Sequence, residues 1–152
     1  MQGARELDGP QADRTSVAGE SLRVLIVDDS RDVVDSLALA LELAGLRTYK
    51  AYDGETALLT AREVVPDVVI LDLLLPDMDG YQLAYALRSD ARCRNTFLMA
   101  YTADATDAAR ARCAAAGVDL YVLKPVDPQE LLRVLTRQRA SAQVADGSRS
   151  RG

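Results

Sequence analysis

Four short apolar runs along the chain each end in a polar side chain, and stretches with helical periodicity separate them. The runs are Val24–Val27 before Asp28 and Asp29, Val68–Leu71 before Asp72, Phe97–Tyr101 before Thr102, and Leu120–Leu123 before Lys124 and Pro125. This alternation is typical of buried parallel strands. Because parallel strands point the same way, their carboxyl ends meet at one edge of the sheet, where ligands bind. The pattern predicts that three carboxylates, a hydroxyl and an ammonium meet in one crevice.

The whole pattern predicts five strand–helix units and therefore an α/β fold. The expected strands cover 23–27, 47–51, 67–71, 97–101 and 119–123, and the expected helices cover 30–44, 54–64, 81–89, 105–115 and about 127–139. Asp53 and Asp127 are placed to cap helices, and Gly45 and Gly117 to end them. Connections this short favour parallel neighbours, right-handed crossovers and helices on both faces of the sheet.

The two ends of the chain are polar and without periodicity. We expect residues 1–21 and 140–152 to be disordered tails around one domain, 22–139. Independent domains rarely have fewer than about 55–65 residues. We therefore expect no DNA-binding domain in the short stretch after Arg139.

Composition and charge argue against several classes of protein. The net charge of −5 argues against a protein that binds nucleic-acid backbones through a basic face, so no direct nucleic-acid partner is expected. No apolar stretch approaches the ~18 residues of a membrane span, and the start of the chain lacks the apolar core of a signal peptide. Cys93 and Cys113 lack metal-ligand spacing and are expected to be free thiols. We expect a soluble, cytoplasmic protein with no membrane partner.

The chain contains no histidine. Histidine is the usual general base and a common metal ligand, so Ser-His-Asp and Cys-His mechanisms and most zinc sites are excluded. The chain also cannot carry a phosphohistidine of its own.

Clustered carboxylates at a sheet edge call for a hard cation. Mg²⁺ prefers oxygen ligands and is usually held by one or two carboxylates plus a phosphate. No P-loop and no G-x-G-x-x-G follows the first strand, so a nucleotide is not the expected ligand. The remaining possibility is that a carboxylate itself accepts a phosphoryl group, as carboxylates do in covalent catalysis.

From about Leu22 to Arg139 the chain resembles the receiver domains of two-component response regulators. The pieces that carry the resemblance are Asp28-Asp29, Asp72 with Pro76-Asp77-Met78-Asp79-Gly80 behind it, Thr102, and Ala116-Gly117 followed by Tyr121 and Lys124-Pro125. Together, and in this order, these pieces are highly specific for that family. The resemblance implies a flavodoxin-like, doubly wound (βα)5 fold with strand order 2-1-3-4-5.

The resemblance also implies a role for each site residue. Asp72 is similar to the phosphoacceptor, and Asp28 and Asp29 resemble the acidic pair that binds Mg²⁺ together with Asp72 and the backbone carbonyl of Leu74. Thr102 and Lys124 are similar to the residues that bind the phosphoryl oxygens. Thr102 and Tyr121 match a pair of switch residues, and the bond before Pro125 is expected to be cis.

Two positions differ from common members of that family. Leu74 is apolar and Asp104 is acidic. In the family these positions tune how fast the acyl phosphate hydrolyses, and the direction of their effect here stays open.

The resemblance implies a signalling module rather than an enzyme. A histidine kinase or histidine phosphotransfer protein would donate the phosphoryl group. The output would pass to a downstream protein or a second copy through the face of the fourth helix, fifth strand and fifth helix.

Two alternatives remain at this stage. One is a phosphatase of the haloacid dehalogenase type, which also uses an aspartyl nucleophile. That family needs a second Asp two residues on, where Leu74 stands. The other alternative is an interaction domain that works without phosphorylation.

Overall fold

The structure is a computed structural model and describes residues 21–138. Its elements are β2 (Arg23–Val27), α1 (Arg31–Leu43), β3 (Arg47–Ala51), α2 (Gly54–Val64), β4 (Val68–Leu71), α3 (Gly80–Ser89), β5 (Phe97–Thr102), α4 (Asp107–Ala116), β6 (Leu120–Leu123) and a further helix over residues 128–138. The predicted tails lie outside the described residues, apart from Ser21, and so does Arg139.

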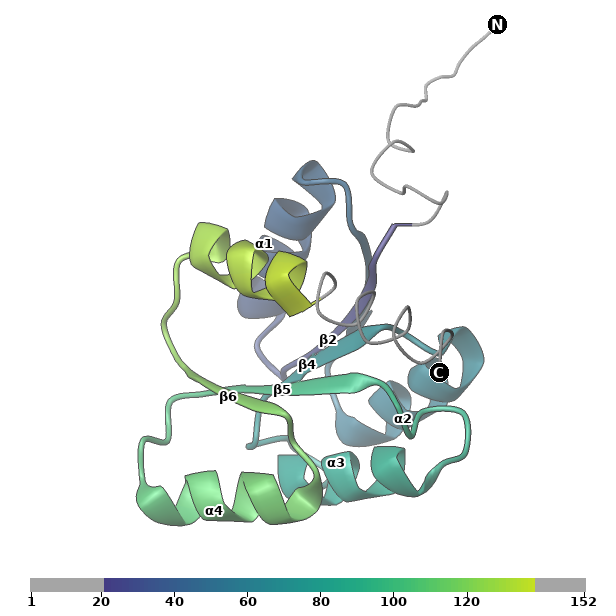
Figure 1. Cartoon of the computed structure of the whole chain (residues 1–152), viewed down its shortest axis with the longest axis vertical. Helices are drawn as coiled ribbons and strands as arrows, with labels where there is room; N and C mark the ends of the chain where they lie inside the picture. Colours follow the sequence, from purple (N-terminus) through teal and green to yellow (C-terminus); the bar gives the residue numbers. More distant parts are fainter. Residues whose placement is uncertain (1–20, 139–152) are drawn as a thin grey trace, which may run out of the picture.

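All five strands are parallel and form one sheet in the order β3-β2-β4-β5-β6. Numbered along the chain, this order is 2-1-3-4-5, which confirms the predicted flavodoxin-like α/β fold. α1 and the helix 128–138 cover one face of the sheet, and α2, α3 and α4 cover the other (Figure 1).

The two faces of the sheet explain the continuous apolar runs. Leu25 and Val27 of β2 pack toward α2, α3 and α4, whereas Val24 and Ile26 pack toward α1 and the helix 128–138. All four are buried, and β4 is buried throughout in the same way. A strand covered on both faces needs apolar side chains at every position.

The strand register brings the predicted site residues to one edge. Val27 pairs with Leu71 across β2 and β4, so the residues that follow them are neighbours. The backbone N–H of Asp72 donates to the carbonyl of Val27 at 2.9 Å, and that of Lys124 donates to the carbonyl of Thr102 at 2.7 Å.

Side-chain caps set the starts of the helices. Ser30, Asp53, Asp79 and Thr106 each accept a hydrogen bond from a backbone N–H in the first turn of α1, α2, α3 and α4 respectively. The predicted start of this helix was residue 105. Because Thr106 is the cap, α4 begins at Asp107 instead. Thr102 belongs to β5, one residue longer than predicted.

One backbone feature has no signal in the sequence. Val65 ends α2 in the left-handed conformation, with φ of 48°. Glycine is the usual residue at such a position, as Gly117 is at the end of α4 with φ of 93°. A β-branched side chain gives no hint of this geometry.

Cys93 and Cys113 are free thiols, as predicted, and the structure shows that both are buried. Within residues 21–138, no helix combines the length and the apolar character needed to cross a membrane.

Candidate functional site

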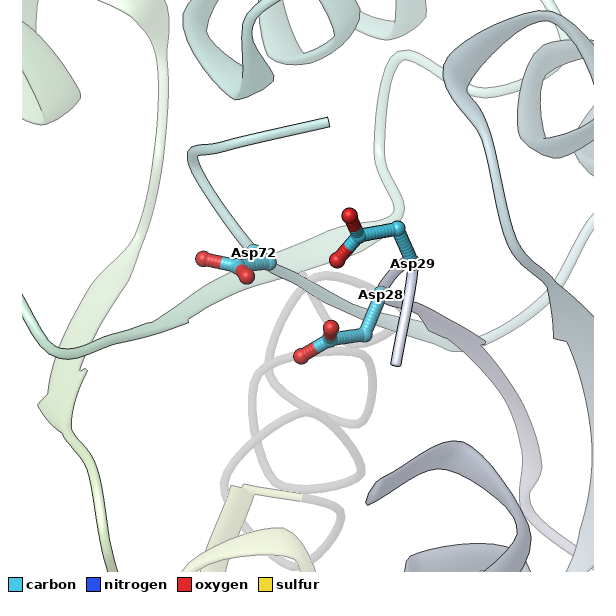
Figure 2. Close-up of side chains that lie close together, drawn as sticks. All are labelled: Asp28, Asp29 and Asp72. Atoms are coloured by element: carbon cyan, nitrogen blue, oxygen red, sulfur yellow. The ribbon is translucent and has the colours of Figure 1, made fainter. Parts of the chain in front are cut away.

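Three carboxylates gather at the carboxyl edge of the sheet. Asp28 and Asp29 follow β2 and Asp72 follows β4, and Figure 2 shows their side chains around one common space. One carboxylate oxygen from each lies within 4.8 Å of the others. Asp28 and Asp72 are buried, at 3% and 8% exposure, while Asp29 is exposed.

Lys124 reaches this cluster from the end of β6. Its Nζ lies 2.6 Å from Oδ2 of Asp28 and 3.3 Å from Oδ2 of Asp72. The lysine side chain is 22% exposed. One ammonium therefore bridges two buried carboxylates that are far apart in the sequence.

Charge and burial compete at this cluster. Burial raises the pKa of Asp72, the positive charge of Lys124 opposes this, and the negative charge of Asp28 adds to it, so that the pKa is raised overall. Burial alone would lower the pKa of Lys124, but the hydrogen bond to Asp28 and the charge of Asp72 outweigh it, and that pKa is raised. The site holds a charged lysine beside an acid whose ionised form is costly.

The donor set fits a hard cation. Three carboxylates against one ammonium leave an excess of two negative charges, and at 4.8 Å two like charges repel by about 3 kcal/mol at an effective dielectric of 20. Oxygen ligands held at about 2.0–2.1 Å from Mg²⁺ lie at most about 4.2 Å apart, so small movements of these side chains would suffice. The cluster suits a divalent cation chemically and in size.

The loop after Asp72 is held by backbone contacts. The N–H of Gly80 donates to the carbonyl of Leu73 at 2.8 Å, and Leu74 pairs with Asp79 in a short bridge. A side chain at Gly80 would collide with the backbone of Asp72 and Leu73, which explains the glycine. The Leu74 N–H donates to Oδ1 of Asp72 at 3.4 Å, while the Leu74 side chain is 74% exposed.

Asp77, in the same loop, caps a helix from outside it. Its two carboxylate oxygens accept from the N–H groups of Gly54 and Glu55, at 2.7 and 2.9 Å, at the start of α2. These two bonds hold the pKa of the Asp77 carboxyl below its ordinary value. This tether was not predicted, because nothing in the sequence indicates a capping residue 23 positions from the helix start.

Thr102 is buried at the end of β5, but its hydroxyl faces its own loop. Oγ1 accepts from the N–H of Asp104 at 3.3 Å, and Asp104 in turn accepts from Thr106. Within residues 21–138, no hydrogen bond joins this hydroxyl to the three carboxylates or to Lys124.

Tyr121, on β6, packs against the core on the side of α2, α3 and α4. Its ring lies under the Arg110 guanidinium, 4.5 Å from the ring centre. The hydroxyl is buried and has no hydrogen-bond partner among the described residues. A buried hydroxyl without a partner costs free energy.

Two further features lie next to the lysine. The Lys124–Pro125 peptide bond is cis. Tyr101 places its ring 5.5 Å from the lysine Nζ, and its hydroxyl accepts from the N–H of Val126. In the sequence Tyr101 belongs to an apolar run, and the hydroxyl inside that run is its one signal of a polar contact.

Comparison with known proteins identifies the family. Residues 24–136 match the response regulator receiver domain. The chain is 37% identical over 135 residues to the probable transcriptional regulatory protein TcrX of Mycobacterium tuberculosis, covering 86% of this chain and 56% of TcrX. It is 39% identical over 118 residues to the DNA-binding response regulator MtrA of Mycolicibacterium smegmatis, covering 77% of this chain and 50% of MtrA. The chain thus spans about half the length of these relatives.

A solved structure with the same fold is that of the chemotaxis response regulator CheY4 of Vibrio cholerae. The TM-score is 0.74 and the identity 30%, with 78% of this chain and 98% of CheY4 covered.

We expected no direct nucleic-acid partner. The names of these two relatives contradict that expectation. MtrA is named a DNA-binding response regulator, and TcrX a transcriptional regulatory protein. The expectation failed because net charge describes only the stretch over which it is summed, and half of each relative lies beyond the matched region. The fold, the acidic cluster with its bridging lysine and the matches in sequence agree, and the chain belongs to the family of response regulator receiver domains.

Proposed function

We propose that this chain is a phosphoacceptor module in which Asp72 takes a phosphoryl group from a phosphohistidine on a partner protein. The observation that carries the proposal is the position of the Asp72 carboxylate. It is buried at a strand end, 3.3 Å from the Lys124 ammonium and in one oxygen cluster with Asp28 and Asp29. Since the chain has no histidine, the donor histidine lies outside it.

The transfer is a simple displacement. An Asp72 carboxylate oxygen attacks phosphorus, a P–O bond forms as the P–N bond breaks, and the electron pair returns to the imidazole nitrogen of the donor. Lys124 provides positive charge for the phosphoryl oxygens, and it remains charged because its pKa is raised.

The cation is part of the proposal. Asp28, Asp29, Asp72 and the backbone carbonyl of Leu74 would hold Mg²⁺. Bound there, the ion would neutralise negative charge on the carboxylates and the phosphoryl group. The donor set and its excess negative charge support this assignment.

The output is proposed to begin at Thr102 and Tyr121. When a phosphoryl group is present, the Thr102 hydroxyl would break its hydrogen bond with Asp104 and donate a hydrogen bond to a phosphoryl oxygen. Tyr121 would then move, which changes the surface formed by α4, β6 and the helix 128–138. MtrA is named a DNA-binding response regulator, and we propose DNA as the final target of the protein to which this chain belongs.

In this role the chain acts as a signalling component and not as an enzyme with a substrate of its own. We place it in the cytoplasm, a reducing compartment that suits its buried free thiols.

Labelling with acetyl phosphate tests the proposal. With Mg²⁺, the wild-type chain should gain one phosphoryl group, Asp72→Asn should gain none, and Asp67→Asn should label like the wild type. Asp67 is a matched control because it lies at the opposite end of β4, where it accepts from the N–H of Arg23. Labelling of Asp72→Asn at another residue would refute the assignment, and mass spectrometry of peptides would locate it.

A further inference from the structure

Tyr101 lies beside the strand end that carries the lysine. Its side chain packs with the core cluster on the side of α1. Its hydroxyl accepts a hydrogen bond from the backbone N–H of Val126 at 3.2 Å, and its ring centre lies 5.5 Å from Nζ of Lys124. The side chain therefore contacts the segment 124–126 at two points.

That segment needs support, because it leaves the sheet at the point where it must hold a functional group. β6 ends at Leu123, and its ladder continues only to the Lys124 N–H, which donates to Thr102. A lysine side chain has a flexible four-carbon stem, so its ammonium is fixed only if the backbone and the surroundings of the stem are fixed.

We propose that Tyr101 is a positioning residue for Lys124. Its hydroxyl anchors the backbone just after the lysine, and its ring faces the ammonium within the distance at which a cation is attracted to an aromatic face. The proposal rests on the proposed function, since the ligand for which Lys124 is positioned is a phosphoryl group.

Tyr101 supports the lysine and not the acids. Within the described part of the chain, no hydrogen bond joins Tyr101 to Asp28, Asp29 or Asp72. Loss of Tyr101 should therefore weaken binding of a phosphoryl mimic without weakening binding of the cation.

Tyr52 is a matched control. Its ring faces the Arg31 guanidinium at 4.0 Å, and its hydroxyl donates to Oδ1 of Asp35 at 3.2 Å. Like Tyr101, it has a cation over its ring and a hydrogen bond at its hydroxyl, although this hydroxyl donates to a carboxylate, and its partners have no assigned role in the site.

The experiment measures beryllofluoride affinity at saturating Mg²⁺, and Mg²⁺ affinity separately, by NMR titration. Tyr101→Phe keeps the ring and should bind beryllofluoride about threefold to tenfold more weakly, as expected for one lost hydrogen bond. Tyr101→Leu also loses the aromatic face and should bind it roughly 10- to 30-fold more weakly. Mg²⁺ affinity should not fall in either variant, and Tyr52→Phe should match the wild type.

Two results would overturn the inference: beryllofluoride affinity of Tyr101→Leu within about twofold of the wild type, or Mg²⁺ affinity that falls in parallel with it. Failure of the wild type itself to bind beryllofluoride would refute the proposed function instead. Amide hydrogen exchange without any ligand then decides on Tyr101. Faster exchange at Val126 in Tyr101→Phe supports the anchor, and unchanged exchange refutes it.

Discussion

Two sides of the same sheet edge differ in how firmly they are held. The acid side consists of β2, β4 and the three aspartates that follow them. The switch side consists of the end of β5, β6 and α4. On the acid side the strands are buried on both faces from Val24 to Val27 and from Val68 to Leu71. On the switch side, β6 is only partly buried, and its last residue, Leu123, is 38% exposed.

The helices show the same contrast. α1 buries Val34, Leu37, Ala38 and Leu41, whereas α4 buries only Ala109 and Cys113. Since buried apolar area is the main source of stability, α4 is held less strongly than α1. We infer that the acid side keeps the three aspartates in place and that the switch side is the one able to move under the proposed function.

Lys124 connects the two sides, so its removal should have the largest effect. Lys124→Ala should weaken beryllofluoride binding on the order of 100-fold, because the bound ligand loses the partly buried ammonium that is proposed to face it. Lys50→Ala is the matched control. Lys50 pairs with Asp35 at 3.0 Å on the surface, and such pairs contribute little. Equal affinities of the two variants, measured by titration, would contradict the role given to Lys124.

A pair of identical substitutions tests the difference in packing. Val68 on β4 and Val122 on β6 both pack toward α1 and the helix 128–138, but only Val68 is fully buried. Val68→Ala should cost about 1.5–3 kcal/mol of unfolding free energy, and Val122→Ala about 1 kcal/mol or less. Urea unfolding measures both, and equal losses would remove the contrast between the sides.

The pKa of Asp72 predicts a smaller effect that depends on pH. In the folded protein the pKa of Asp72 is raised, so Asp72 loses its proton at a lower pH in the unfolded chain than in the folded chain. As pH rises between these two pKa values, the free energy of unfolding falls, and above the folded pKa it stays reduced. Without a divalent cation, Asp72→Asn should therefore be more stable than the wild type at pH 7, with Tm higher by on the order of 5 °C. The difference should vanish below the ordinary pKa of aspartate.

Asp77 supplies a control of opposite sign. Its pKa is lowered, so its contribution to stability is present above the ordinary pKa and is lost as pH falls through the folded value. Asp77→Asn should lower Tm at pH 7 and have no effect in acid. Thermal melts across pH test both variants, and shifts of the same sign would contradict the electrostatic account.

The sequence predicts most of the fold, because four of the five strands are largely apolar runs and turn or capping residues mark several helix ends, while the strand order follows from the resemblance to receiver domains. It also predicts which strand ends bring the acids and the lysine together, since the carboxyl ends of parallel strands lie at one edge. Contacts between distant side chains are another matter. The Asp77 tether and the Tyr101–Val126 bond depend on which segments meet in space, and no local pattern encodes that. The left-handed conformation of Val65 has no signal in its own side chain.

The map of amide NMR shifts when beryllofluoride and Mg²⁺ bind tests most directly whether the two sides are coupled. Shift changes are expected at the three aspartates, at residues 102–106 and 118–126 and in α4, with little change in β3. In Thr102→Ala, the changes at the acids should persist and those around Tyr121 and in α4 should largely disappear. Shift changes confined to residues 28–29 and 72–79 in the wild type would contradict the claim that ligand binding at the three aspartates alters the switch side.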